Sequence, residues 1–284
     1  MTQARRHDIV AGMTRTLLQY QIDAFAAQAF EGNPAAVILT PAPLDEALMQ
    51  TLAQENNLSE TAYLVPRSRS GHYDLRWFTP TTEIEFCGHA TIASAHALMA
   101  EHKAKTDEDG AYIFHAQIGQ LRVTKSGLDY VLRAPVARAK PATITAAIRA
   151  AFPLPLKGAF NAGPNLYIVF ERAQDVRALS PDFSAIVPLS AHGVGITARG
   201  DEGYDCVSRF FVPAEGINED PVTGSAHAAI GPYWAKVLGK ENVLAYQASA
   251  RGGTLRLTVQ GDFIDIAGPA VTVMQSQIRL PRSI

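Results

Sequence analysis

Two stretches of the sequence share one design. One is Asn218–Ile230, NEDPVTGSAHAAI, and the other is Thr81–Ala97, TTEIEFCGHATIASAHA. In each, a polar segment with acidic residues leads to a single glycine and then to an alanine-rich run. Turn residues before such a run are typical of a loop that leads into a helix, and a helix without a polar face is usually buried. The sequence therefore predicts two buried helices, over about Ala90–Ala100 and Ala226–Leu238.

The two stretches belong to a longer internal repeat. Three short segments occur twice, in the same order, and the two copies are 131, 133 and 136 residues apart. The pairs are Gly32–Leu39 (GNPAAVIL) with Gly163–Phe170 (GPNLYIVF), Arg76–Pro80 (RWFTP) with Arg209–Pro213 (RFFVP), and Gly88–Ala93 (GHATIA) with Gly224–Ala229 (GSAHAA). Three ordered matches with slowly changing separations indicate two copies of one unit of about 130 residues, which is an ordinary domain size.

Each unit contains mainly short strands in addition to its buried helix. Turn signals bound several runs rich in β-branched and aromatic residues, and such runs predict strands. The predicted strands are Leu17–Phe25, Ala35–Leu39, Ala62–Val65, Tyr73–Phe78, Tyr167–Phe170, Cys206–Val212, Leu255–Val259 and Phe263–Ile266. Apolar spacing over Leu44–Asn57 predicts one further helix. The predicted fold class is α+β, with strands curled around one central helix in each half.

The domain prediction follows from the repeat. We place an N-terminal domain over residues 17–127 and a C-terminal domain over 128–271, with the boundary near Gly127. In one reading, the C-terminal segment 272–284 completes the first domain. Residues 1–16 are polar and lack the apolar region of a secretory signal, so we expect a flexible tail.

Composition excludes several classes of protein. The chain has 284 residues, 47% of them hydrophobic and 18% charged, which is normal for a globular protein. Its formal charge is −2, so no basic footprint for nucleic acid is present. Two cysteines cannot form a disulfide framework or a four-ligand zinc site. No apolar run approaches the roughly 20 residues that span a membrane. We expect a cytoplasmic protein without nucleic-acid or membrane partners.

The glycines that open the two buried helices, Gly88 and Gly224, predict an anion site. The first N–H groups of a helix have no partner within the helix, and the helix dipole is positive there. If the two units pack face to face, a substrate carboxylate could bind between both helix starts. The alternative is that glycine and the following residue serve only the turn and the helix cap.

Groups that the two copies do not share are the candidates for chemistry. Glu60 has no carboxylate at the matching place of the second unit, and Asp220 aligns with the apolar Ile84. His89 follows Gly88, whereas Ser225 follows Gly224. We therefore predict a one-sided site of Glu60, His89, Asp220 and Ser225. Each also has an ordinary structural reading, as a solvated carboxylate, a locally bonded histidine, a turn residue or a helix-terminal serine.

The remaining reactive side chains fit structural roles better. His96 and His227 lie inside alanine-rich helices, where packed histidines with satisfied hydrogen bonds are the common case. Together with His89 they have no spacing that specifies a metal site. Cys87 is expected to be a small buried hydrophobic residue rather than a nucleophile. The sequence thus predicts no metal.

Four motifs in order make the chain resemble the PhzF-like (phenazine biosynthesis-like) family of the diaminopimelate epimerase superfamily. They are Asp23–Leu39 (DAFAAQAFEGNPAAVIL), Asn57–Val65 (NLSETAYLV), Arg76–Thr91 (RWFTPTTEIEFCGHAT) and Gly216–His227 (GINEDPVTGSAH). The resemblance implies two pseudo-symmetric epimerase-like domains, each a curled sheet or barrel around a central helix, with the active site between them. It also implies a homodimer.

The resemblance further implies the roles of site residues. The family's acid/base glutamate matches Glu60, and its Gly-His pair matches Gly88 and His89. Its aspartate and Gly-Ser pair match Asp220 and the Gly224–Ser225 segment. The characterised member isomerises a dihydro-hydroxyanthranilate without a metal or organic cofactor. The resemblance therefore predicts a cofactor-independent isomerase that moves a proton on a small carboxylate-bearing substrate.

Alternatives to this function stay open at this point. Epimerases of the superfamily use two opposed cysteines; Cys87 matches the first, but Pro221 stands where the second would be. A racemase would therefore need Glu60 and some second base. A cysteine hydrolase would pair Cys87 with His89, two side chains expected to diverge at the helix start. A non-enzymatic binding protein with the same fold is the third alternative.

Overall fold

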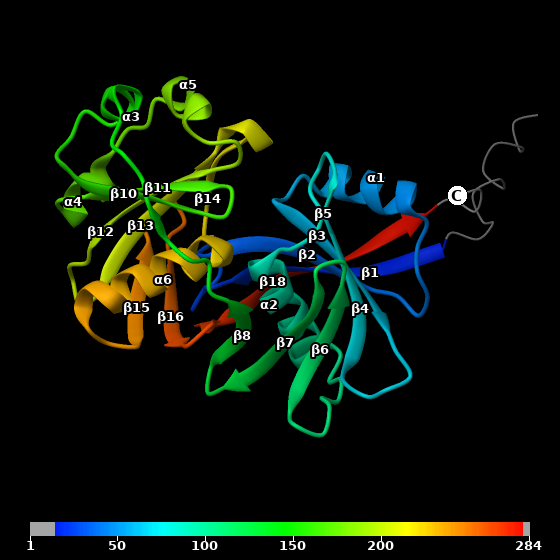
Figure 1. The fold of residues 1–284 in the computed structure, drawn as a ribbon. Coiled ribbons are helices and arrows are strands. Elements are labelled where there is room, and N and C mark those ends of the chain that lie inside the picture. Colours follow the sequence, from blue (N-terminus) through cyan, green and yellow to red (C-terminus); the bar gives the residue numbers. More distant parts are fainter. Residues whose placement is uncertain (1–14, 281–284) are drawn as a thin grey trace, which may run out of the picture.

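Two helices form the centres of two similar units, and strands curl around each of them (Figure 1). The structure is a computed structural model that describes residues 15–280. Helix α2 (Gly88–His96) continues as a π-helical turn (Ala97–Glu101) and is the central helix of the first unit. Helix α6 (Gly224–Leu238) is the central helix of the second. Eight of the nine residues of α2, from Gly88 to Ala95, are buried, as expected for a helix that strands surround on most sides.

The strands of the first unit follow one another in a mostly antiparallel sheet. Their order across the sheet is β18-β1-β2-β3-β4-β6-β7-β8, with parallel pairs at β2–β3 and β4–β6 and the short β5 beside β4. The bounds are β1 (Arg15–Ala24), β2 (Asn33–Leu39), β3 (Glu60–Pro66), β4 (His72–Phe78), β5 (Glu83–Ile84), β6 (Ala111–Ala116), β7 (Gly119–Ser126), β8 (Asp129–Pro135) and β18 (Ala270–Leu280).

The second unit repeats this topology strand by strand. Its order is β9-β10-β11-β12-β13-β15-β16-β17, with parallel pairs at β11–β12 and β13–β15 and the short β14 beside β13. The bounds are β9 (Lys140–Pro141), β10 (Leu156–Ala162), β11 (Asn165–Phe170), β12 (Val194–Arg199), β13 (Cys206–Val212), β14 (Ile217–Asp220), β15 (Asn242–Gln247), β16 (Gly253–Gln260) and β17 (Phe263–Gly268). The predicted pair of pseudo-symmetric domains is confirmed.

Smaller helices cover the outer faces of the two sheets. Helix α1 (Glu46–Asn56) packs on β3 and β4, and Asp45 caps its start through the N–H groups of Ala47 and Leu48. The second unit has three short helices, α3 (Ala146–Ala151), α4 (Ala173–Ala178) and α5 (Phe183–Ile186), over a separate apolar cluster. Single 3₁₀ turns lie at Val187–Leu189 and Pro213–Glu215. No helix among residues 15–280 has the length and apolar character needed to cross a membrane.

A strand pairing and a turn are two of the junctions between the units. Strands β8 and β17 pair as antiparallel neighbours, so one sheet runs through both units. The second junction is the turn before β2. There the Gly32 N–H donates to the Gly252 carbonyl at 2.8 Å, and Arg251 donates to the Gly32 carbonyl at 2.8 Å. Arg251 also forms an ion pair of 2.9 Å with the buried Asp23.

The predicted elements lie where expected, with small shifts of their ends. The two central helices begin two residues before the predicted starts, at Gly88 and Gly224. The predicted boundary near Gly127 falls in the turn between β7 and β8. Of the predicted tail, residues 1–14 lie outside the described residues, and Arg15 and Thr16 begin β1.

A substitution at Gly32 tests the role of the turn at the second junction. It has φ = +63°, and a Cβ there would lie 2.1 Å from the Ala24 carbonyl oxygen. We expect Gly32→Ala to lower the free energy of unfolding by about 3–5 kcal/mol, from the left-handed backbone and the clash together. Its repeat counterpart Gly163 has φ = +55° and open space, so Gly163→Ala should cost only about 1–2 kcal/mol. Urea unfolding of both variants measures the difference, and equal losses would contradict the clash.

Candidate active site

The starts of the two central helices meet where the units face each other. A Cβ on Gly88 would lie 3.7 Å from the Gly224 Cα, so the two backbones are almost in contact. No side chain of the preceding residue, Cys87 or Thr223, caps either helix. The first N–H groups of both helices therefore lie close together at their positive ends.

A cavity of about 570 Å³ opens beside these helix starts. Its walls include the predicted site residues, together with apolar side chains from both units. The predicted residues that line it are Glu60, Gly88, His89, Asp220, Gly224 and Ser225. The apolar walls include Ile84, Phe86, Phe210 and Val212. The structure thus brings every predicted site residue to one cavity.

Glu60 and His89 form a close charged contact at the cavity. Glu60 is the first residue of β3 and His89 the second residue of α2. The distance between Glu60 Oε2 and His89 Nε2 is 2.9 Å, and the side chains are only 13% and 5% exposed. The contact is an ion pair at hydrogen-bonding distance, and it fixes the carboxylate beside the imidazole.

The neighbours of His89 favour its charged form. Burial by itself lowers the pKa of His89, but Cys87 and Glu60 raise it more, so the pKa lies well above 6.5. Burial raises the pKa of the Cys87 thiol to about 11. The thiol is therefore protonated at neutral pH, and Glu60 is the neighbour whose negative charge acts on His89.

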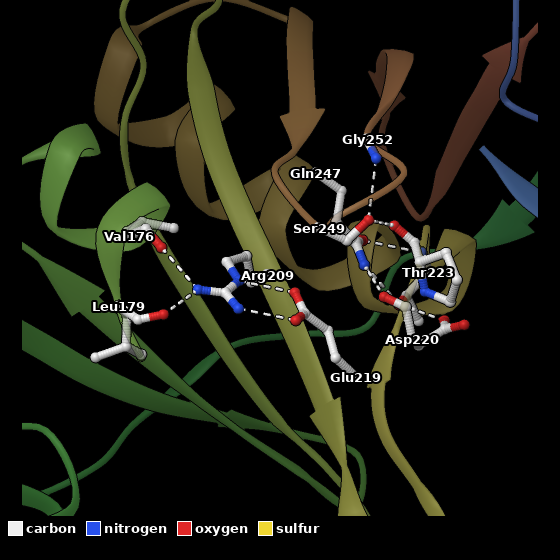
Figure 2. A network of polar contacts seen from close by, with 10 residues as sticks. Val176, Leu179, Arg209, Glu219, Asp220, Thr223, Gln247, Ser249 and Gly252 are labelled. Carbon is white, nitrogen blue, oxygen red and sulfur yellow. Dashed lines mark hydrogen bonds and ion pairs between the residues drawn. The ribbon is translucent and has the colours of Figure 1, made fainter. Parts of the chain in front are cut away.

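Hydrogen bonds from three residues hold Asp220, and Figure 2 shows those from Thr223 and Gln247. The Thr223 hydroxyl donates to Oδ2 at 2.5 Å, and the Asn33 amide donates to Oδ1 at 2.7 Å. The side chain of Gln247 donates to the Asp220 carbonyl at 2.7 Å and accepts from the Thr223 N–H at 2.9 Å. Asp220 is the last residue of β14. These hydrogen bonds fix it to the turn that opens α6.

The pKa of Asp220 is raised above its ordinary value. Loss of hydration is the largest cause, and the negative charge of Glu60 adds to it. The nearby His89 and the hydrogen bonds from Thr223 and Asn33 act in the opposite direction and reduce the shift. Glu60 and Asp220 therefore lie in different environments, Glu60 paired with an imidazole and Asp220 held by neutral donors.

Two arginine–glutamate pairs brace the loops that lead to the helix starts. In the second unit, Arg209 donates to Glu219 at 2.7 and 2.8 Å and also reaches the carbonyls of Leu179 and Val176 (Figure 2). In the first unit, Arg76 donates to Glu83 at 2.7 and 2.6 Å. These arginines begin the repeated RWFTP and RFFVP segments, so the repeat preserves the support of the site as well as the helix starts.

Cys87 corrects one expectation. Its side chain does not diverge from His89, since the distance from Sγ to His89 Nδ1 is 3.5 Å. The extended backbone at Cys87 turns Sγ back over the first helical turn.

Glu60, Cys87 and His89 offer atoms of the kind that bind metals within 4.8 Å of one another. A metal-bound histidine donates from its other nitrogen, whereas His89 Nδ1 faces the Asn33 NH₂ donor at 3.1 Å. This arrangement suits a metal poorly.

His227 has structural partners on both ring nitrogens, as predicted, whereas His96 has one on Nε2 and none among the described residues on its buried Nδ1. His227 is fully buried, and its ring nitrogens lie 2.8 Å from the Thr223 carbonyl and 3.1 Å from the Ser208 hydroxyl. Burial lowers its pKa to about 4. His96 Nε2 lies 3.0 Å from the Thr272 hydroxyl on β18.

Sequence reasoning missed two residues of the site. Asn33 lay inside the quoted Gly-Asn-Pro turn, yet nothing local indicated that its amide would reach Asp220 across the two units. Gln247 ends β15, and no motif marked it. Both residues are fully buried and act through contacts that are distant in sequence.

Comparisons with known proteins agree with this architecture. The family model described as "Phenazine biosynthesis-like protein" matches residues 22–276. An uncharacterized isomerase of Pseudomonas aeruginosa is 43% identical over 262 residues, covering 92% of this chain and 98% of the relative. A second uncharacterized isomerase, from Halalkalibacterium halodurans, is 42% identical over 270 residues, with 92% and 98% coverage. The prediction of an isomerase agrees with these names.

Solved structures share the fold. The crystal structure of a phenazine biosynthesis protein of the PhzF family from Enterococcus faecalis has a TM-score of 0.88 and 41% identity, and the match covers 94% of this chain and all of that one. A hydroxyproline epimerase from Agrobacterium vitis is only 12% identical, with a TM-score of 0.61, and shows the epimerase fold alone. With two pseudo-symmetric units around a shared cavity and a family model that matches most of its length, the chain belongs to the phenazine biosynthesis-like family.

Proposed function

We propose that the protein is a cofactor-independent isomerase in which Glu60 moves a proton on a small carboxylate-bearing substrate. Glu60 takes a proton from a carbon beside an unsaturated or carboxylated group, and the electron pair of the broken C–H bond moves into that group. The protonated Glu60 then returns the proton to a different carbon of the same molecule. The atoms balance without an oxidant or a second substrate.

The observation that carries this proposal is a buried carboxylate held at the wall of the cavity. Glu60 lines the cavity with only 13% of its side chain exposed, and its Oε2 lies 2.9 Å from His89 Nε2. An ionised carboxylate offers about four acceptor sites, so this contact leaves others for a ligand. A general base needs this capacity together with a fixed position.

The helix starts supply the second part of the proposal. The backbone N–H groups near Gly88 and Gly224 would bind the substrate carboxylate and stabilise negative charge that develops on it during proton transfer. The apolar walls at Phe86 and Phe210 would hold the carbon skeleton and exclude water from the reacting carbon. His89 would keep the Glu60 carboxylate in place through the 2.9 Å contact.

Glu60→Gln tests the acid/base role. We expect it to lower deuterium uptake from D₂O into a panel of small carboxylates by at least about 100-fold, because the amide cannot accept the proton. Mass spectrometry of the panel measures the exchange, and equilibrium dialysis measures whether the same compound still binds. Glu85→Gln, at an exposed glutamate outside the cavity lining, is the matched control. Unchanged exchange in Glu60→Gln would refute the proposal.

Cys87→Ala separates this mechanism from a cysteine nucleophile. The pKa of the thiol is raised to about 11 by burial, so it is not a thiolate at neutral pH. We expect the alanine variant to keep deuterium uptake within about tenfold of the unmodified protein. Loss of all turnover, together with rapid alkylation of Cys87 by iodoacetamide at pH 7, would instead favour the cysteine mechanism.

The charged His89 predicts a pH dependence of stability. Its folded-state pKa is raised above 6.5, so its stabilising effect is complete below pH 6.5 and is lost as the pH rises through the folded-state value. We expect the unfolding free energy of the unmodified protein, relative to His89→Gln, to fall as the pH increases above 6.5. Urea unfolding from pH 6 to 9 measures this difference. A constant difference over that window would contradict the ion pair.

A further inference from the structure

Asn33 links the two units at the site itself. It is the first residue of β2, and its side chain is fully buried. The amide nitrogen lies 2.7 Å from Asp220 Oδ1, 2.9 Å from the Val222 carbonyl oxygen and 3.1 Å from His89 Nδ1. The first two atoms belong to the second unit and the third to the first. One carboxamide therefore contacts two of the predicted catalytic side chains from opposite sides of the cavity.

The hydrogen-bond partners of Asn33 determine which side of its carboxamide carries the NH₂ group. If the amide were reversed, its oxygen would face the Asp220 carboxylate and the Val222 carbonyl, which are both acceptors. The NH₂ group therefore points to them, and Asn33 Oδ1 is left without a hydrogen-bond partner among residues 15–280. A carboxamide nitrogen has donors only. The two hydrogens of this NH₂ group serve three acceptors, so one of them is shared with His89 Nδ1 when the ring is neutral. The proton of the neutral imidazole then lies on Nε2, beside Glu60.

Hydrogen bonds between the two units fix the backbone next to Asn33. The preceding residue, Gly32, donates to Gly252 of the second unit, and Arg251 donates back to Gly32. Asn165, the first residue of the matching strand β11, contacts His192 and Tyr167 instead of a carboxylate. The link to Asp220 is thus a feature of one copy, as Glu60 is.

We propose that Asn33 is a positioning residue that couples the two units to the chemistry, holding the Asp220 carboxylate and directing the His89 proton toward Glu60. The catalytic part of this inference rests on the proposed function. Asn33 does not line the cavity, so it acts through Asp220 and His89 and not on the substrate.

The charged and titratable groups that face His89 determine how its titration should change in an Asn33 variant. They are Glu60 from β3, Cys87 from the residue before α2 and Asp220 from β14. Asn33→Asp replaces the donor beside Nδ1 with an oxygen that can accept from it, and it places a second carboxyl group beside Asp220. We expect this variant to raise the midpoint of the His89 titration by at least about one pH unit.

The first experiment needs no substrate. The full chain is labelled with ¹⁵N-histidine, and the ring nitrogens are followed by long-range ¹H–¹⁵N NMR from pH 6 to 10, with His89→Gln used to assign the signal. In the unmodified protein the neutral ring should carry its proton on Nε2. An Nδ1-protonated neutral ring, or the same titration in Asn33→Asp as in the unmodified protein, would overturn the proposal.

The second experiment separates positioning from simple stability. Asn33→Ala and Asn33→Asp should each lower the maximal rate of deuterium uptake at least about tenfold, with little change in the substrate concentration at half-maximal rate. Thr197→Val is the matched control, because it removes a buried hydroxyl that bonds Val207 and Trp234 away from the cavity. It should lower the melting temperature and keep the rate. Asn33 variants that behave like Thr197→Val would overturn the catalytic role.

The two proposals fail differently. If Glu60→Gln leaves the exchange unchanged while Asn33→Asp shifts the His89 titration, the proposed function is wrong and the coupling of Asn33 to His89 stands. If Glu60→Gln abolishes exchange and both Asn33 variants retain it, the function stands and the positioning role of Asn33 is wrong.

Discussion

The contact between the two helix starts at Gly88 and Gly224 determines where the site lies and what it contains. Two positive helix ends repel each other, and their uncapped N–H groups need acceptors. Negative charge in the same cavity offsets both effects. Glu60 and Asp220 lie there, and a substrate carboxylate would add to them. The acidic side chains and the predicted anion site are therefore two consequences of one arrangement of backbone dipoles.

The repeated parts of the chain form the walls of the cavity, and the unrepeated parts place its reactive side chains on one side. Both units supply a central helix, the same strand order and an arginine–glutamate pair that braces the loop before the helix. Glu60, Asp220 and the amide contact of Asn33 occur on one side only. A symmetric cavity could bind a ligand in two orientations, whereas this one presents Glu60 to a single face.

The sequence predicted the features that depend on local pattern. Alanine-rich runs indicated the central helices, and the repeat indicated that their starts would meet if the two units packed face to face. The sequence did not predict contacts between residues that are far apart in the chain. The amide of Asn33 meets Asp220, 187 residues away, and β8 meets β17, because the two sheets join. The Cys87–His89 contact was predicted wrongly, since the backbone before a helix can turn a side chain back over the first turn. The homodimer and the cytoplasmic location stay predictions.

Under the proposed function, the one-sided carboxylate restricts the reaction. A single base that removes a proton and returns it acts on one face of the substrate, so the proton moves between carbons without inversion at a stereocentre. A racemase needs a second base on the opposite face. By the resemblance to the epimerases, Pro221 stands where their second thiol would be, and the Cys87 thiol stays protonated at neutral pH. Asp220 is the carboxyl group nearest to that role, but Thr223 and Asn33 already use both of its oxygens. The site therefore favours transfer of a proton along one face over inversion.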